Sequence, residues 1–469
     1  MLQYILGLLL LLIPVALNAQ KIVISGKALD YSRKEISFYL IPDPVLRQKF
    51  ELGTTDVAPD GTFSIVLPVS ETTEIYTDLE KYCGTMVVEP GKKYAVTLPP
   101  FSLRTANEAH SAFFKPALYW LGLPGTDRSD LNFSIRSFVT EFNLETYKNS
   151  VQIYQKKSKE VVSEIITRLD QKYSTNQNAY FRTLEKYYFA ELEYVVYQIT
   201  PEYVIKKYFA TQPVQLHHPV YQRTFETIFT DFLRRQSQDI KNRKIINLTN
   251  SGNWLELVGF FENRDYKKEF AELVVLKGLN DGYYTGSFSK TGVIKAIDAA
   301  QAATTSPLLQ PVAKQIKSAL ERLTAGGKAP AINLSNLEKK AVSLGQLRGK
   351  FVYISFFNSR SSDCRTELDS IVSLEKRLKQ VLTFVSVSLD DDFYDASKLW
   401  KSKRYSWELW NGSKQKQLVI NYNASITPVF CLIDPDGRIQ LCQAPSPSQG
   451  FEPLFLKIFR DYKFKQQRN

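Results

Sequence analysis

The stretch KFVYISFFNSRSSDCRTELDSIVSLEKRLK, from Lys350 to Lys379, decides the fold of its region because it joins two different patterns. Its opening, KFVYISFF, is a near-continuous apolar run, which is typical of a strand buried on both faces of a sheet. A polar turn follows, and apolar residues then recur at helical spacing, at Leu368, Ile371, Val372 and Leu378. A buried strand that leads into an amphipathic helix predicts the beginning of an alternating α/β domain.

The sequence after this stretch continues the alternation. The strand VLTFVSVSL, a helical stretch around DASKLWKSK, the hairpin VFCLIDPDGRIQLC and a last helix, EPLFLKIFRDY, follow in order. Asp434 to Gly437 supply the residues that a tight hairpin turn needs. We therefore expect a C-terminal domain over residues 326–469, with a mixed sheet covered by helices on both faces. Gly326 and Gly327 at its beginning are typical of a linker.

Two regions of different pattern precede this domain. A chain of 469 residues with 44% apolar content is long enough for two or three domains. Residues 20–100 alternate in short runs broken by turn signals such as Asp60-Gly61 and Pro90-Gly91, which predicts an antiparallel β-sandwich of about six strands. Residues 101–325 change to helical spacing, which predicts an all-α middle domain. The predicted fold class is multidomain α+β, with a C-terminal α/β fold. The helical stripes are at Val162, Ile165, Ile166 and Leu169, at Phe181, Leu184 and Tyr188, and at Phe225, Ile228, Phe229 and Phe232.

Residues 1–19 have the pattern of a secretory signal peptide. An uncharged apolar run from Ile5 to Leu17 is short for a membrane span, and Ala19 suits cleavage before Gln20. A membrane anchor is the alternative, but the flank lacks a basic cluster. We expect a periplasmic or otherwise extracytoplasmic protein with no stable membrane span after cleavage. Because no cysteine stands near the cut, we expect no lipid anchor.

The net charge of +12 does not by itself indicate nucleic-acid binding. The basic pairs, such as Lys206-Lys207 and Arg234-Arg235, are scattered, and an exported protein seldom meets nucleic acid. We expect a protein or peptide partner in the cell envelope instead.

No motif for a cofactor or a metal stands out. The adjacent His217 and His218 point apart on regular structure, so we interpret them as part of a loop or helix start. The acidic run Asp390-Asp391-Asp392 lacks the spacing of a calcium loop, and we interpret it as a solvated loop.

Several separated motifs in the last third of the chain match one known family. They are Ala329-Pro330, Ser343-Leu344, Gly349-Lys350 before the first buried strand, and ITPVFCLIDPDG. With these motifs, residues 328–469 resemble the thioredoxin-fold domain of the TlpA/ResA-type thiol-disulfide oxidoreductases. The resemblance implies a thioredoxin-like fold and places Thr427-Pro428 at the family's cis-proline position. The whole layout also resembles bacterial envelope proteins that carry such a domain.

The active turn of that family reads Trp-Cys-x-x-Cys-Arg, and here the equivalent residues are Arg360 to Arg365. The resemblance thus implies that Ser361 replaces the attacking cysteine and that Cys364 is the surviving second one. A serine hydroxyl cannot form a disulfide, so we expect the ordinary dithiol reaction to be lost. Ser361 could instead cap the helix that begins here. Asp363 suits the positive helix end, but a carboxylate tends to raise the pKa of a nearby thiol.

Three hypotheses of different classes follow. The first is a degenerate redoxin domain in a binding or assembly protein, whose groove between the Ser361 turn and Thr427-Pro428 holds an extended peptide by strand addition. The second is a redox enzyme that uses Cys364, either a single-cysteine oxidoreductase or a peroxiredoxin-like peroxidase, with Cys431 or Cys442 as a possible resolving thiol. Ser361-x-x-Cys364 resembles the Thr-x-x-Cys of peroxiredoxins, although the proline of that motif is absent.

The third hypothesis is purely structural. Cys431 and Cys442 lie on the two strands of one predicted hairpin and could form a cross-strand disulfide. Counting from the turn, however, places Cys431 opposite Gln440 or Leu441, so we expect buried thiols instead. With Cys83 and Cys364 the chain has four cysteines, and their spacing does not decide their pairing.

Overall fold

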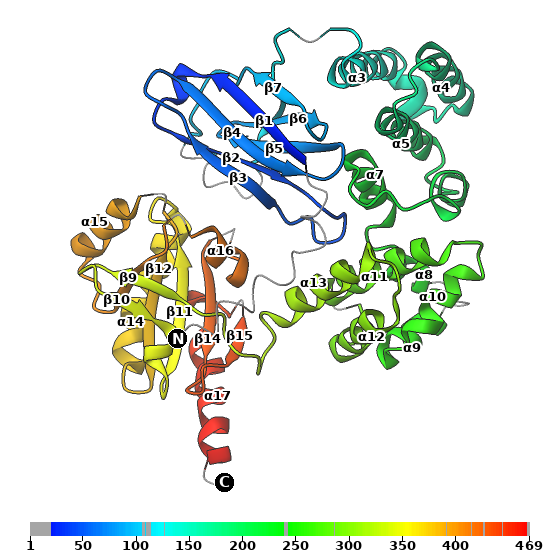
Figure 1. Cartoon of the computed structure of the whole chain (residues 1–469). Helices are drawn as coiled ribbons and strands as arrows, with labels where there is room; N and C mark the ends of the chain where they lie inside the picture. Colours follow the sequence, from blue (N-terminus) through cyan, green and yellow to red (C-terminus); the bar gives the residue numbers. More distant parts are fainter. Residues whose placement is uncertain are drawn as a thin grey trace. The chain divides into compact units, whose positions relative to one another are not determined.

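The computed structural model describes residues 20–105, 108, 114–125, 127–238, 243–285, 287–390, 392–413, 415–424, 427–442 and 444–466 (Figure 1). The predicted signal peptide, residues 1–19, lies outside these ranges. The chain forms two compact units, and each is described by itself. Of the described residues, the N-terminal unit holds those up to Arg104 and those within Lys115–Lys317, and the C-terminal unit holds those within Thr105–Phe114 and those from Ser318 on.

The N-terminal unit begins with two sheets that share one core. Their strand orders are β4-β1-β7 and β3-β2-β5-β6-β8. Side chains from both sheets meet between them, among them Ile24 of β1, Phe38 of β2 and Met86 of β6, all fully buried. The strands are β1 Gln20–Lys27, β2 Glu35–Leu40, β3 Phe50–Asp56, β4 Thr62–Val69, β5 Thr73–Leu79, β6 Tyr82–Val88, β7 Lys93–Val96 and β8 Ala117–Trp120.

The prediction of a purely antiparallel arrangement is wrong at two pairings. β7 runs parallel to β1, and β8 runs parallel to β6. Parallel neighbours need a crossover connection, and the chain reaches β7 only after passing through the other sheet. β8 also lies within residues 101–325, so the predicted all-α segment contains a strand, and its long helices begin at Leu131.

Helices make up the rest of this unit, except that residues 318–321 at the end of α13 belong to the C-terminal unit. Val162, Ile165 and Leu169 are buried, as the predicted stripe on α4 requires. None of the helices within the described residues is both long and apolar enough to cross a bilayer. The helices are α3 Leu131–Lys148, η2 Val151–Gln155, α4 Lys159–Tyr173, α5 Ala179–Val196, α6 Glu202–Ile205, η3 Lys206–Ala210, α7 Pro219–Phe229, α8 Phe232–Gln238, α9 Arg243–Ser251, α10 Trp254–Glu262, α11 Lys268–Thr285, α12 Lys290–Ala303 and α13 Leu309–Glu321.

Buried polar contacts join the helices to the sheets. At the start of α3, the Asn132 side chain accepts a hydrogen bond from the Val87 amide and donates one to the Val87 carbonyl, both at 2.9 Å. The side-chain amide of Gln222 on α7 donates a hydrogen bond to the backbone carbonyl of Ile41 at 2.8 Å. Because Asn132 and Gln222 are almost fully buried, these bonds satisfy groups that water cannot reach, and sheets and helices form one unit.

The two adjacent histidines have different environments. His218 directly precedes α7, whose first residue is Pro219, and its ring is buried with Nε2 3.3 Å from the Tyr180 carbonyl. His217 is exposed, and its Nδ1 lies 2.6 Å from the Glu71 carboxylate. Burial, together with a smaller effect of the nearby Arg223, lowers the pKa of His218 to about 4.

The lowered pKa of His218 predicts acid sensitivity of the N-terminal unit. Between the ordinary histidine pKa of about 6.5 and the folded value of about 4, His218 is protonated in the unfolded chain but neutral in the folded unit. His218 alone should therefore contribute a decline of about 2 kcal/mol to the free energy of unfolding from pH 7 to pH 5. Urea unfolding followed by tryptophan fluorescence at both pH values measures this. His218→Gln should lose most of the decline and His217→Gln should keep it; equal declines in both variants would contradict the assignment.

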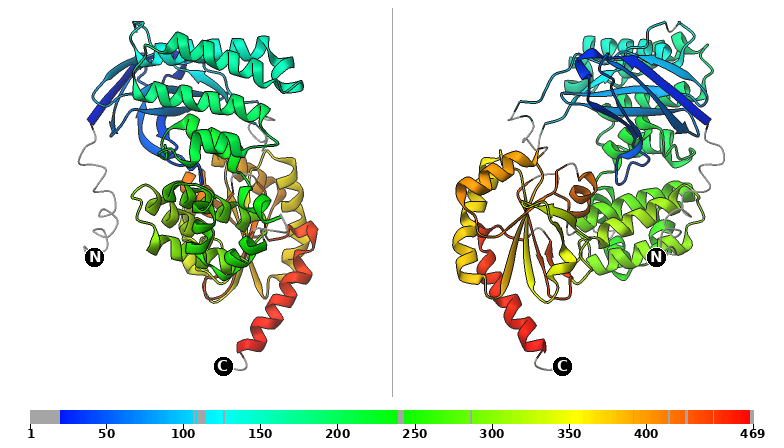
Figure 2. Two further views of the ribbon diagram at one scale, coloured as in Figure 1. Left: turned by 90° about the vertical axis from the view of Figure 1, so that its right-hand side faces the viewer. Right: turned by 60° about the vertical axis from the view of Figure 1, so that its left-hand side comes forward.

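The C-terminal unit is a seven-stranded mixed sheet with helices on both faces, as predicted (Figure 2). The strand order is β10-β9-β13-β12-β11-β14-β15, in which β11, β12 and β13 run parallel and β14 runs antiparallel to β11. The strands are β9 Asn333–Asn336, β10 Ala341–Ser343, β11 Phe351–Phe357, β12 Leu382–Ser388, β13 Glu408–Asn411, β14 Val429–Ile433 and β15 Ile439–Cys442, and the helices are η5 Leu344–Leu347, α14 Ser362–Leu378, α15 Phe393–Lys403, α16 Lys416–Tyr422, η6 Pro447–Gln449 and α17 Phe451–Gln466.

β11 lies inside this sheet, and all its side chains are buried. Tyr353 and Phe357 point to one core, which α14, α15 and α17 cover. Ile354 and Phe356 point to the other, which α16 covers. This alternation explains why the sequence of β11 is apolar except at Ser355, whose hydroxyl pairs with that of Ser386 at 2.6 Å, since neither face reaches water.

Candidate functional site

The turn between β11 and α14 is organised around Ser361. The Ser361 hydroxyl accepts a hydrogen bond from the Cys364 amide at 3.3 Å, and the Ser361 carbonyl accepts one from the Arg365 amide at 3.1 Å. Ser361 is thus the N-cap of α14, and its side chain satisfies one of the amides that a helix start leaves open. This is the capping role that the sequence suggested.

Cys364 lies in the first turn of α14 and is fully buried. Its side chain belongs to the core that also contains Phe357 and Leu368. Cys431 belongs to the core on the other face of the sheet, and Cys442 packs against that second core. The structure therefore brings Cys364 together with Ser361 but not with either cysteine suggested as its resolving partner.

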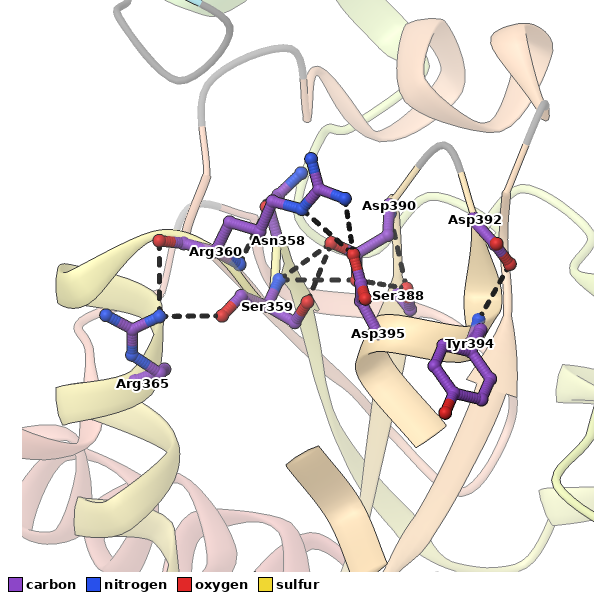
Figure 3. A network of polar contacts seen from close by, with 9 residues as sticks. All are labelled: Asn358, Ser359, Arg360, Arg365, Ser388, Asp390, Asp392, Tyr394 and Asp395. Carbon is purple, nitrogen blue, oxygen red and sulfur yellow. Dashed lines mark hydrogen bonds and ion pairs between the residues drawn. The ribbon is translucent and has the colours of Figure 1, made fainter. Parts of the chain in front are cut away.

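A buried carboxylate, Asp390, holds the turn from the side of β12 (Figure 3). Asp390 accepts hydrogen bonds from the Ser359 amide at 3.0 Å and from the Ser359 hydroxyl at 2.9 Å. Its second oxygen accepts one from the Ser388 hydroxyl at 2.7 Å. Asp390 is only 3% exposed, and burial raises the pKa of its carboxyl group.

The interpretation of Asp390 to Asp392 as a solvated loop is therefore wrong for Asp390. It is buried because the ends of β11 and β12 meet at one sheet edge, where its oxygens satisfy the buried Ser359 amide. Asp391 lies outside the described residues, and the exposed Asp392 caps α15 by accepting from the Tyr394 amide at 2.9 Å. The position of Asp390, two residues after the buried parallel strand β12, was the sequence signal that could have indicated its role.

Two arginines fix the remaining part of the turn (Figure 3). The Arg360 guanidinium binds the Asp395 carboxylate, with Nε at 2.9 Å and Nη2 at 2.5 Å. Arg365 Nη1 donates to the carbonyl oxygens of Ser359 at 3.1 Å and Arg360 at 3.3 Å. The guanidinium of Arg365 is thus bound to the backbone of the turn.

A cavity of about 420 Å³ opens beside the turn, between the start of α14 and the start of β14. The Thr427-Pro428 peptide bond is cis, and Pro428 lines this cavity. The predicted groove lay between the Ser361 turn and Thr427-Pro428; Pro428 lines the cavity, whereas Ser361 and Thr427 are not among its lining residues. Its lining residues are Asp363, Thr366, Glu367, Pro428, Val429, Phe430, Ala444, Ser446 and Gln449.

Glu367 lines one side of the cavity and was not among the predicted site residues. Its carboxylate accepts from the Ser446 hydroxyl at 2.9 Å and from the Ser448 amide at 3.1 Å. These bonds join α14 to the segment that follows β15. Ser446 and Ser448 lie far from Glu367 in the sequence, so no local pattern pointed to this contact.

The register of the β14–β15 hairpin differs from the prediction. Cys431 lies directly opposite Cys442, and the two Sγ atoms are 3.7 Å apart. Leu432 faces Leu441 and Ile433 faces Ile439, so the ladder passes over Gln440 as a bulge. The side-chain amide of Gln440 donates a hydrogen bond from Nε2 to the Asp434 carboxylate at 2.9 Å. This bond holds the extra residue in place.

The hydrogen bonds of Asp390 predict its effect on stability. Asp390→Ala should lower the free energy of unfolding of the C-terminal unit by about 1–3 kcal/mol, because the buried Ser359 amide loses its acceptor. Asp461→Ala, at an exposed position on α17, is the matched control and should change stability by less than about 0.5 kcal/mol. Urea unfolding at pH 7 measures both, and similar values for the two variants would show that Asp390 does not hold the turn.

Comparison with known proteins places the C-terminal unit among redoxins. The model of the AhpC/TSA family matches residues 325–442. Thiol-disulfide oxidoreductase ResA of Bacillus subtilis (strain 168) is 24% identical over 120 residues, which cover 25% of this chain and 66% of that protein. ResA of Bacillus cereus (strain ATCC 10987 / NRS 248) is 25% identical over 140 residues, which cover 29% of this chain and 80% of the relative.

Solved structures give matches of the same kind. The thioredoxin domain of a thiol-disulfide oxidoreductase from Bacteroides vulgatus is 29% identical, with 25% of this chain and 86% of that chain covered and a TM-score of 0.24. A thiol:disulfide interchange protein DsbE from Chlorobium tepidum, described as putative, is 26% identical, with 25% and 84% covered and a TM-score of 0.24.

Proposed function

Taking the C-terminal unit as a thioredoxin-like redoxin domain of the TlpA/ResA type, we propose that its β11–α14 turn has lost dithiol-disulfide exchange and that the unit serves binding or assembly. The observation that carries this proposal is the state of the β11–α14 turn. Ser361 stands where the resemblance expects the attacking cysteine, and its hydroxyl caps the helix. A hydroxyl in that place can accept a hydrogen bond but cannot form a mixed disulfide.

The environment of Cys364 supports the loss of exchange. Thiol-disulfide exchange requires a thiolate that reaches the partner's sulfur. Cys364 is fully buried in an apolar core, and Cys431 and Cys442 belong to the opposite face of the sheet. A disulfide also requires the two Cβ atoms to lie about 3.5–4.5 Å apart, which two faces of one sheet do not allow.

The cavity beside Pro428 supports a role in binding an extended segment. Val429, Phe430 and Ala444 give it an apolar side, while Asp363 and Glu367 add two carboxylates. An apolar side chain flanked by a lysine or arginine is complementary to this lining. We infer that the domain binds a peptide or protein segment of that composition.

The place of action follows from the N-terminal sequence. The apolar run from Ile5 to Leu17 and the small Ala19 support export, so the proposed partner belongs to the cell envelope.

The alternative is a thiol enzyme that uses Cys364 alone, as a single-cysteine oxidoreductase or a peroxidase. The specific observation in its favour is the place of Cys364 in the first turn of α14, where its backbone amide donates to the Ser361 hydroxyl of the Ser-x-x-Cys turn. In the peroxiredoxin-like form of this alternative an arginine would assist the cysteine, but Arg365 binds the carbonyl oxygens of Ser359 and Arg360.

Insulin reduction and peroxide reduction distinguish these functions. The mature protein should show no turnover above that of Cys364→Ala in either assay, because Ser361 cannot attack a disulfide and Cys364 is buried. Ser361→Cys should restore a Cys-x-x-Cys turn and gain insulin reduction, whereas Ser362→Cys, which creates no such turn, should not. Turnover of the unchanged protein that disappears in Cys364→Ala would overturn the proposal and establish the alternative.

Binding to the cavity is tested separately with fluorescent peptides. Thr366→Trp places an indole at the cavity and should weaken binding of short apolar-cationic peptides by about tenfold or more, a loss of about 1.4 kcal/mol. Ser373→Trp, exposed on the same helix but outside the cavity lining, is the control and should bind like the unchanged protein. Fluorescence anisotropy measures both. If peptides with glutamate in place of the basic residue bind equally well, the cavity does not select its ligand as proposed.

A further inference from the structure

The hairpin formed by β14 and β15 contains a pair of facing thiols. Cys431 and Cys442 are direct partners across the two antiparallel strands, with their Sγ atoms 3.7 Å apart. A disulfide bond measures about 2.05 Å, so the structure shows the two side chains as neighbouring thiols. Partners across antiparallel strands have Cα atoms about 4.5–5.5 Å apart, within the range that a disulfide spans. Rotation of the two side chains is therefore enough to form the bond.

The bulge at Gln440 creates this pairing. Without the extra residue, Cys431 would face Leu441, and the two sulfurs would point to opposite faces of the hairpin. The hydrogen bond from Gln440 to Asp434 holds the bulge beside the turn. The alignment of the two cysteines thus depends on a specific local structure.

The two thiols differ in their access to solvent. Cys431 is 1% exposed, whereas Cys442 is only partly buried and lies on β15, the last strand of the sheet. A molecule from solution can therefore reach Cys442 first. Cys431 is placed to react only with a sulfur already bound at Cys442.

We propose that Cys431 and Cys442 are a redox-active dithiol that small or protein disulfides oxidise to an intramolecular disulfide. The Cys442 thiolate attacks one sulfur of the external disulfide, forms a mixed disulfide and releases the first thiolate. The Cys431 thiolate then attacks Cys442 Sγ, which forms the cross-strand bond and releases the second thiolate. Both thiol protons pass to solvent or to the departing thiolates, so the domain loses two hydrogens and the external disulfide gains them.

This site is separate from the β11–α14 turn and does not depend on the proposed loss of activity there. Cys431 and Cys442 lie at the core that α16 covers, whereas Cys364 lies at the core that α14 covers. Cys83, in the other unit, lies within 3.5 Å of the Tyr39 hydroxyl, and burial raises its pKa, which disfavours its thiolate. The hairpin pair is therefore the site where we expect oxidation.

Oxidised glutathione is the probe that tests the proposal on the full chain. After incubation, unfolding and alkylation with iodoacetamide, peptide mass mapping should show a Cys431–Cys442 cross-link with a mass loss of about 2 Da, while Cys364 and Cys83 are alkylated. Cys431→Ala should stop at the first step and keep one glutathione on Cys442. Cys442→Ser, at the more exposed position, should form neither product.

Thermal unfolding provides a second readout. It compares the unchanged protein with Cys442→Ser and therefore does not depend on whether Cys431→Ala, at the buried position, folds. The oxidised protein should unfold at a higher temperature than the reduced one, because the cross-link restricts the unfolded hairpin, and Cys442→Ser should show no such shift. The proposal would be overturned if all four cysteines were alkylated after oxidation or if a cross-link included Cys364. Glutathione that remains on Cys442 of the unchanged protein would also overturn it.

Discussion

The burial of β11 on both faces is the constraint on which the C-terminal unit depends. Phe351 to Phe357 are all buried, and their side chains alternate between two separate cores. A strand placed in this way must have parallel or antiparallel partners on both edges, and β12 and β14 supply them. Its C-terminal end then fixes where the chain leaves the sheet, so the polar turn at Ser361 lies at the sheet edge because β11 ends there.

The turn keeps a costly polar structure even though it has a serine in the expected place of a cysteine. A buried carboxylate is unfavourable unless hydrogen bonds satisfy it, and Asp390 receives bonds from Ser359 and Ser388. Arg360 and Arg365 add bonds on the other side of the turn. These contacts hold the backbone in one conformation, which suits a surface that recognises a partner by shape as well as one that performs chemistry.

The cysteines of this unit are divided by the sheet itself. Cys431 on β14 points to the face of the sheet that α16 covers, whereas Cys364 on α14 packs on the other face, so the two thiols lie at different cores. The hairpin pair is instead brought together by a single bulge residue, Gln440. A change of one residue in register would separate the two sulfurs, which shows how strongly the chemistry available to this unit depends on strand pairing.

The sequence by itself determined the features that depend on local periodicity and on turn chemistry. It predicted the buried strand Phe351–Phe357, the amphipathic helix after it, the N-cap at Ser361 and the mixed sheet of the last domain, because burial on two faces and helix capping leave direct marks in the residue pattern. Only the tertiary structure decided the burial of Asp390, the contact of Glu367 with Ser446, the parallel pairings of β7 and β8, and the alignment of Cys431 with Cys442. Each of these depends on groups far apart in the chain or on a bulge, and neither leaves a periodic signal. The physical reason is that the spacing of apolar residues along one element depends on which of its faces is shielded from water. Which residues pack against that face depends on the packing of the whole unit.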